Sequence, residues 1–401
     1  MSKETTAIVV GAAVAGSAVA NALGSRGIPT LVIEKGFERD NSTRGDFLHP
    51  PTLRFLEPWG VLRGLFEDGA LPIYHLAVSH RTLGRLANYD IRAQGEGPAS
   101  RSIAVPHDRI EAVMKGCAEH WPSVTAIQGT VTGLLQERGR VVGVRARVDG
   151  GGEREFRAHL VAGCDGGMSL VRRELGIETD RYLYDHYFVY IQADGPTDPP
   201  AAIHFCLDEV GVIMVASRPN QRMRIAIYCE RGTQNDLLRR SDAELYDYVV
   251  YRVPWLEGVR FTRDDVHVYA VARSLADRFW APGAALVGDA AHTTHPAGAT
   301  GMNLAISGAA RLAELIGPVL AAQPVDPAAL DAALHAYSAE RRPAAALALE
   351  HNHQQAGRIW MNNCHLDPYT YARDADPNAA WGVEGAGWGQ NPAALMRSAG
   401  Y

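Results

Sequence analysis

The sequence predicts an α/β protein in which a Rossmann-type nucleotide-binding domain is interleaved with an antiparallel β-sheet domain and followed by C-terminal helices. Three observations predict this class: a strand–turn–helix with glycines at the N-terminus, alternating apolar and polar residues between 182 and 230, and a second glycine-rich strand–turn–helix at 284–304. A chain of 401 residues suggests two domains or one large interleaved unit.

The composition argues against several classes of function. Hydrophobic residues make up 47% and charged residues 21%, which is typical of a globular protein with a substantial core. The formal net charge is -6 and the basic residues are scattered, so we expect no nucleic-acid partner. No long apolar segment precedes the first strand and no uninterrupted apolar run has membrane-spanning length, so we expect no membrane span. The five cysteines are widely spaced without a CxxC pair, which indicates reduced thiols in a cytoplasmic protein.

The first strand–turn–helix has the features of a dinucleotide site. An apolar strand at 6–10 leads into the turn Gly11–Gly16, a helical pattern follows, and a second strand at 30–34 ends on Glu34. In such a βαβ unit the pyrophosphate lies at the helix N-terminus, and the carboxylate binds a ribose hydroxyl. Ala13 stands where a second glycine usually lies, so we expect a slightly displaced phosphate.

The stretch Gly288–Asn303 is the second candidate site. Asp289 follows a short apolar strand and could bind a ribitol or ribose hydroxyl, while the N–H groups of the next helix could hold an anion or a polarised ring edge. Pro296, Gly298 and Gly301 leave room for a flat ligand against the backbone.

The string Leu160–Arg172 is a further strong signal, whereas Arg44 and Arg109 are weaker candidates. Asp165 and Arg172 are placed to form a charged pair beside a nucleotide, although Asp165 could instead cap a helix. Arg44 lies in a glycine-containing loop from which it could reach a phosphate or remain solvated, and Arg109 opens a helix from which it could face a cofactor or the surface. His292–His295 and His351–His353 lack a converging third ligand, so we expect no metal site.

Together, these stretches resemble the single-component FAD-dependent aromatic hydroxylases (group A flavoprotein monooxygenases, p-hydroxybenzoate hydroxylase-like) over residues 3 to about 320. The resemblance implies FAD as cofactor and NADPH or NADH as donor. It also implies hydroxylation or epoxidation of a small aromatic or polycyclic substrate with O₂ through a flavin hydroperoxide. The implied cofactor-binding residues are Gly11, Ala13, Val14, Ala15, Gly16, Glu34, Lys35, Arg44, Arg109, Asp165, Gly288, Asp289, Pro296, Gly301, Met302 and Asn303.

The same resemblance implies a discontinuous domain organisation. We expect an FAD-binding domain at 1–75, 100–180 and 265–320, a substrate-binding β-sheet domain at 76–99 and 181–264, and a C-terminal helical cap and tail at 321–401. The oligomeric state and the role of the aromatic tail are not predicted.

Two alternatives remain open at this point. The turn GAAVAGS and Gly308 also resemble flavin-dependent halogenases and geranylgeranyl-reductase-type enzymes, and a third hypothesis is a non-catalytic flavin-binding protein. A halogenase-like WxWxIP stretch is missing, because Trp280-Ala281-Pro282 lacks the first tryptophan. No catalytic residue is identified: the candidates are His49, His204 and Tyr228, and the further pocket candidates are Met214 and Tyr190.

Overall fold

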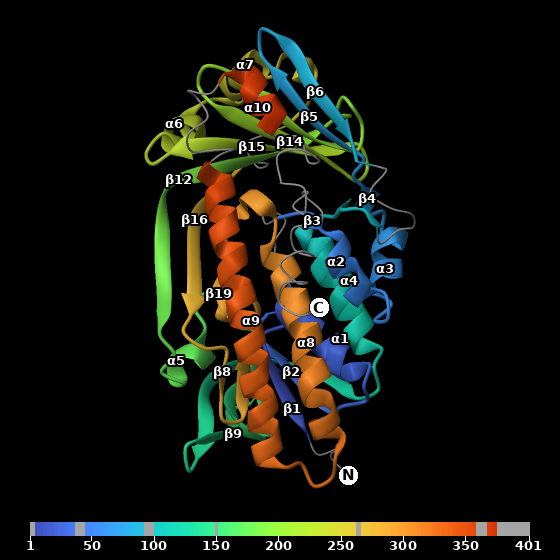
Figure 1. Cartoon of the computed structure of the whole chain (residues 1–401), viewed down its shortest axis with the longest axis vertical. Coiled ribbons are helices and arrows are strands. Elements are labelled where there is room, and N and C mark those ends of the chain that lie inside the picture. Colours follow the sequence, from blue (N-terminus) through green and yellow to red (C-terminus); the bar gives the residue numbers. More distant parts are fainter. Residues whose placement is uncertain are drawn as a thin grey trace.

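The computed structural model describes residues 5–36, 45–91, 100–148, 151–261, 266–357 and 367–374. Its two large sheets lie one above the other along the long axis of the molecule (Figure 1). The nucleotide-binding part, with β1, β2 and α1, forms the lower half of that view, and an antiparallel sheet with β5, β14 and β15 forms the upper half. The long strands β12 and β16 run from one half to the other.

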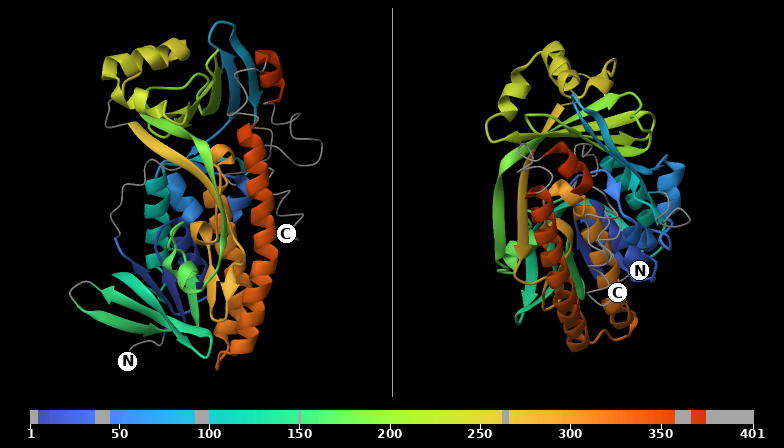
Figure 2. Two further views of the ribbon diagram at one scale, coloured as in Figure 1. Left: turned by 90° about the vertical axis from the view of Figure 1, so that its left-hand side faces the viewer. Right: turned by 45° about the horizontal axis from the view of Figure 1, so that its top comes forward.

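The lower sheet has eight strands in the order β10-β9-β8-β2-β1-β11-β18-β17. Its central strands are parallel, and their apolar residues are buried because helices cover the sheet. The strands are β1 (Ala7–Val10), β2 (Thr30–Glu34), β8 (Val124–Glu137), β9 (Arg140–Val148), β10 (Glu153–Arg157), β11 (Leu160–Gly163), β17 (Trp280–Ala281) and β18 (Ala284–Leu286). The β8–β10 meander projects from this half of the molecule (Figure 2).

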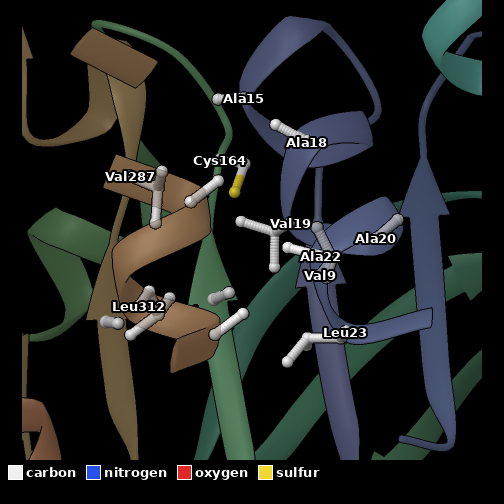
Figure 3. Close-up of a cluster of buried hydrophobic side chains, with 14 of the residues drawn as sticks. Val9, Ala15, Ala18, Val19, Ala20, Ala22, Leu23, Cys164, Val287 and Leu312 are labelled. Carbon is white, nitrogen blue, oxygen red and sulfur yellow. The ribbon is translucent and has the colours of Figure 1, made fainter. Parts of the chain in front are cut away.

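Helix α1 (Val14–Gly24) is buried along its whole length between the lower sheet and its neighbouring helices. Val19 and Leu23 of this helix lie in the same buried cluster as Val9, Val287 and Leu312 (Figure 3). Small side chains let helix and sheet approach closely, and this brings the start of α1 next to the Gly288 turn.

The upper sheet also has eight strands, in the order β19-β16-β12-β15-β14-β13-β5-β6. Apolar residues alternate along its strands, so that one face lies towards the nucleotide-binding half and the other packs against helices α6 and α7. The strands are β5 (His75–His80), β6 (Gly84–Asp90), β12 (Thr179–Asp194), β13 (Ala202–Leu207), β14 (Val212–Arg218), β15 (Arg222–Glu230), β16 (Val266–Ala276) and β19 (His292–Thr293). A small third sheet is formed by β3 (Phe47–Leu48), β7 (Ile103–Ala104) and β4 (Leu71–Pro72).

The remaining elements are mostly helical. They are α2 (Pro50–Leu56), α3 (Val61–Glu67), α4 (His107–Glu119), α5 (Leu170–Glu174), α6 (Gln234–Arg239), α7 (Asp242–Arg252), η3 (Pro254–Leu256), η5 (Gly288–Ala290), η6 (Pro296–Gly298), α8 (Gly301–Ala321), α9 (Pro327–Ala356) and α10 (Pro368–Asp374). Helix α8 is long and apolar enough, by length and composition alone, to cross a membrane, but 67% of that stretch is buried inside the fold.

Helix α9 is continuous from Pro327 to Ala356, and Tyr337 within it is buried and donates its hydroxyl to the carbonyl of Leu286. The predicted domain boundaries remain predictions. Strand β16, at the start of the predicted FAD-binding segment 265–320, pairs with β12 in the upper sheet. Arg44 and most of the C-terminal tail lie outside the described residues.

Candidate active site

The predicted dinucleotide turn lies where β1 passes into α1. The Glu34 carboxylate at the end of β2 accepts the N–H groups of Ala12 (2.8 Å) and Gly36 (3.0 Å). It therefore fixes the turn from the side where a ribose would bind. Lys35 is exposed next to it, and Ala13 precedes the first turn of α1 in extended backbone.

Gly288 brings the second predicted loop against this turn. Its φ is +64°, and a Cβ built on it would lie 2.6 Å from the Cβ of Ala15 in α1. Both the left-handed backbone and the close approach require glycine. The start of α1 and the loop that contains Asp289 are thereby held in contact.

A cavity of about 190 Å³ lies between the loop that contains Asp289 and the upper sheet. Asp289, Pro296, Gly301 and Met302 line it from the loop and from the start of α8. From the upper sheet, its lining includes Leu76, Tyr190, Ile203, Met214, Arg224 and Tyr269. The cavity is thus mostly apolar with a few polar groups, as binding sites for small aromatic molecules are.

Asn303 is a predicted cofactor residue whose side chain forms hydrogen bonds within the protein. Its amide oxygen accepts the His49 N–H (2.8 Å), and its NH₂ group donates to the carbonyls of Phe47 (3.1 Å) and Ala299 (2.7 Å). Asn303 therefore ties the 47–49 segment to the loop before α8.

Of the three catalytic candidates, the structure brings only His49 to the cavity. Its Nε2 lies 3.0 Å from the carbonyl oxygen of Gly298 and its Nδ1 lies 3.0 Å from Ser102 Oγ. A carbonyl only accepts, so Nε2 carries the proton and Nδ1 accepts from the serine hydroxyl. Burial lowers the pKa of His49, which keeps it neutral. Both ring nitrogens are hydrogen-bonded, so His49 links Ser102 to the loop at Gly298, and its predicted catalytic role remains a prediction.

His204 and Tyr228 lie outside the cavity lining. His204 lies on the far face of the upper sheet, stacked 5.1 Å from Trp255, because neighbouring strand residues point to opposite faces. Tyr228 packs against His186, with ring centroids 5.0 Å apart. The sequence indicates that side chains alternate between the two faces of β13 and β15, but it does not show which set of side chains faces the cavity.

Arg109 faces away from the cavity, where it forms an ion pair with Asp68 on the side of α3. His107, two residues earlier and at the first turn of α4, lines the cavity instead. Its Nε2 lies 3.2 Å from Glu111, and its buried Nδ1 has no hydrogen-bond partner within the described part of the chain. Arg109 was predicted from the family resemblance and its place at the start of the helix, and His107 was not among the predicted residues.

Asp165 supports the start of α5, although the N-cap residue of that helix is Ser169. Its carboxylate accepts the Ser169 hydroxyl (2.5 Å) and the Val171 N–H (3.1 Å) at the start of α5. The Arg172 guanidinium donates to the carbonyls of Ala290 (2.8 Å) and Gly167 (2.7 Å). It thereby joins the Gly288–Ala290 turn to the turn that precedes α5, while the predicted contact of Asp165 and Arg172 with a nucleotide remains a prediction.

A buried charge cluster at the cavity wall was missed by the sequence analysis. Asp46 is 2% exposed and lies 3.0 Å from Arg218 and 3.1 Å from Arg224. Burial raises the pKa of Asp46, while the two guanidinium groups act to lower it. Arg224 lines the cavity with its guanidinium carbon 5.0 Å from the centre of the Tyr190 ring. The sequence signal for this cluster was Arg224, a charged residue beside the apolar run of β15.

The residues present fit a bound flavin. The start of the 21-residue helix α8 contributes Gly301 and Met302 to the cavity, so its unpaired N–H groups and positive dipole end are available to an electron-rich ring edge. The buried, unpartnered Nδ1 of His107 offers a further polar contact on the same cavity. Within the described residues, no group of three His, Cys, Asp or Glu side chains could hold a metal.

Comparisons with known proteins agree with this geometry. The family model described as "FAD binding domain" matches residues 4–352. A curated relative, 6-methylpretetramide 4-monooxygenase of Streptomyces rimosus, is 31% identical over 76% of this chain and 73% of its own length. Among solved structures, PqsL, a probable FAD-dependent monooxygenase from Pseudomonas aeruginosa, has a TM-score of 0.78 at 22% identity over 93% of this chain and 100% of its own. The p-nitrophenol 4-monooxygenase PnpA from Pseudomonas putida DLL-E4 has a TM-score of 0.76 at 22% identity over 100% and 97%. The match spans most of the chain, and we conclude that this protein belongs to the FAD binding domain family as an FAD-dependent monooxygenase of the aromatic hydroxylase type.

Proposed function

We propose that this monooxygenase uses NADPH or NADH and O₂ to hydroxylate or epoxidise a small aromatic or polycyclic substrate that carries an anionic oxygen. Bound FAD supplies the hydride acceptor and the oxygen chemistry. The substrate class is supported by the mostly apolar cavity and by the relative that acts on 6-methylpretetramide.

In this proposal, the predicted turns hold the cofactor. Gly11–Gly16 and Glu34 would bind the ADP half, and Asp289 with the start of α8 would face the ribitol and the ring edge. The α8 dipole would stabilise negative charge on the ring edge, and the upper sheet would exclude water from the reacting face.

The observation that carries the substrate proposal is the position of Arg224. Two guanidinium groups share the single carboxylate of Asp46, and Arg218 is also bonded to Gln192 (2.6 Å) outside the cavity lining. Arg224 is therefore the guanidinium of this cluster that presents positive charge to the apolar cavity. In such surroundings a charge-assisted hydrogen bond to an anionic oxygen is strong.

The test compares a matched pair of ligands, 2-naphthoate and 2-naphthamide, which differ in charge and little in shape. Titration of the holoenzyme, followed by the change in the flavin spectrum, is expected to show the acid binding at least about tenfold more tightly. Arg224→Gln should remove that preference. Arg222→Gln should retain it, because Arg222 pairs with Asp194 at the exposed end of the same strand. Equal binding of the two ligands, or a preference that survives in Arg224→Gln, would contradict the proposed substrate class.

A second candidate function is a flavin enzyme of the same scaffold that receives reduced flavin from a partner, as a halogenase does. The GAAVAGS turn and Gly308 favour it. Failure of both NADPH and NADH to reduce the bound FAD would support this candidate. We also propose a cytoplasmic location, which the widely spaced cysteines support.

A further inference from the structure

Two buried histidines behind the loop before α8 have no part in the chemistry proposed above. His295 immediately precedes Pro296 and is fully buried, and His186 on β12 is 2% exposed. Neither lines the cavity. Their Nε2 atoms lie 2.9 Å apart, which is a hydrogen-bond distance.

The backbone determines where the protons of this pair lie. The N–H of Ala297 donates to His295 Nδ1 (3.0 Å). A backbone amide can only donate, so Nδ1 is unprotonated and the proton of His295 is on Nε2. That N–H then donates to His186 Nε2, which must be unprotonated. Both imidazoles are therefore neutral, and the hydrogen bonds run from Ala297 through His295 to His186.

Aromatic side chains hold the two imidazoles in place. The Tyr184 ring lies 4.8 Å from His295 and 5.2 Å from His186, and its hydroxyl lies 2.9 Å from Nδ1 of His353 at the end of α9. Tyr228 covers the other side of His186. The pair is thus packed against β12, β15 and the end of α9, which lie outside the loop.

The segment that this pair reaches forms part of the cavity wall. Ala297 lines the cavity, and the carbonyl of Gly298 accepts the hydrogen bond from His49 on the opposite side. His49 therefore holds the carbonyl of Gly298 from the cavity side. On the other side, His295 holds the N–H of Ala297 and is itself bonded to His186 on β12.

We propose that His295 and His186 are positioning residues that hold the segment Pro296–Gly298 in the place where it contacts the flavin. They touch neither substrate nor reacting atoms. The inference rests on the proposed position of FAD, but it can be tested without turnover of a substrate.

The experiment uses two substitutions that each keep one of the two hydrogen bonds of His295. In His295→Asn, the amide oxygen lies near the position of Nδ1, so it can still accept from Ala297 but no longer reaches His186. In His295→Gln, the longer amide reaches the position of Nε2, so it keeps the contact to His186 but loses Ala297. The measurements are the FAD dissociation constant of the reconstituted apoprotein, the shape of the visible flavin band, and the H₂O₂ released per NADH oxidised.

We expect His295→Gln to weaken FAD binding about tenfold and to raise H₂O₂ release, because one buried hydrogen bond to the loop is lost. His295→Asn and His186→Phe should each weaken binding about threefold, and the double variant should be no worse than either, because both break the same contact. His204→Phe is the matched control, since His204 is equally buried on the far face of the sheet.

Two results would overturn the inference. One is wild-type FAD affinity, flavin spectrum and H₂O₂ release in His295→Gln. The other is an additive loss of FAD affinity when His295→Asn and His186→Phe are combined, together with an equal loss in His204→Phe. That result would indicate a general packing role. If His295→Gln does not fold, His186→Phe and His295→Asn decide the question by the same measurements. Loss of NADH oxidation with intact FAD binding would count against the proposed function and not against this inference.

Discussion

Substitution of Gly288 by alanine tests whether close contact between α1 and the flavin loop builds the site. At φ +64°, a left-handed conformation costs a non-glycine residue about 1–2 kcal/mol. A new Cβ at 2.6 Å from the Cβ of Ala15 adds an overpacking cost of about 1–3 kcal/mol. We therefore expect Gly288→Ala to lower the free energy of unfolding by about 2–5 kcal/mol. FAD affinity should fall as well, because α1 and the Asp289 loop are pushed apart.

Gly27→Ala provides the control for this prediction. Gly27 has a similar φ of +70°, and a Cβ built on it meets nothing within 4 Å. Gly27→Ala should cost only the conformational part, about 1–2 kcal/mol, and leave FAD binding unchanged. The assay is urea unfolding followed by tryptophan fluorescence, together with FAD titration of the apoprotein. The reasoning is refuted if Gly288→Ala is no more destabilising than Gly27→Ala and binds FAD with wild-type affinity.

Three further predictions concern single groups. Arg172→Met should lower the free energy of unfolding by about 2–3 kcal/mol, since it leaves the carbonyls of Ala290 and Gly167, in two different turns, without their donor. Urea unfolding measures this, and an unchanged midpoint would count against the role of Arg172 in joining the two turns. Asp46→Asn should cost about 3–5 kcal/mol and weaken folding more than Arg222→Gln does, because two buried guanidinium groups lose their carboxylate. Burial lowers the pKa of His186 to about 4, in spite of the opposing charge of Asp185. Its stabilising contribution is thus complete above the unfolded value near 6.5 and is lost as pH falls towards about 4; the pH dependence of the urea midpoint should flatten over this window in His186→Phe.

The fold could be predicted because its signals are local. The glycines, apolar strands and helix starts around Gly11–Gly16 and Gly288–Asn303 determine the strand–turn–helix units directly. The alternation between 182 and 230 likewise predicted antiparallel strands, which the structure contains as β12 to β15.

The site was predicted less completely because its geometry depends on long-range contacts. Asp46 meets Arg218 and Arg224 across more than 170 residues of sequence, and no local pattern links them. The choice between His107 and Arg109 depends on which side of α4 faces the cavity. Strand β13 has apolar residues on both faces, so the sequence pattern does not show which face His204 occupies. The contacts predicted for the cofactor residues themselves remain predictions.

The central claim is that this protein reduces its own FAD with a pyridine nucleotide before oxygen is used. The most direct measurement mixes the holoenzyme anaerobically with NADPH and then with NADH, and follows the visible band of oxidised flavin with and without an aromatic acid such as 2-naphthoate. The account predicts bleaching by at least one donor, accelerated by the acid in the wild type and less so in Arg224→Gln. A yellow protein that neither donor bleaches, with any aromatic compound present, would contradict it and would indicate an enzyme that depends on a separate reductase.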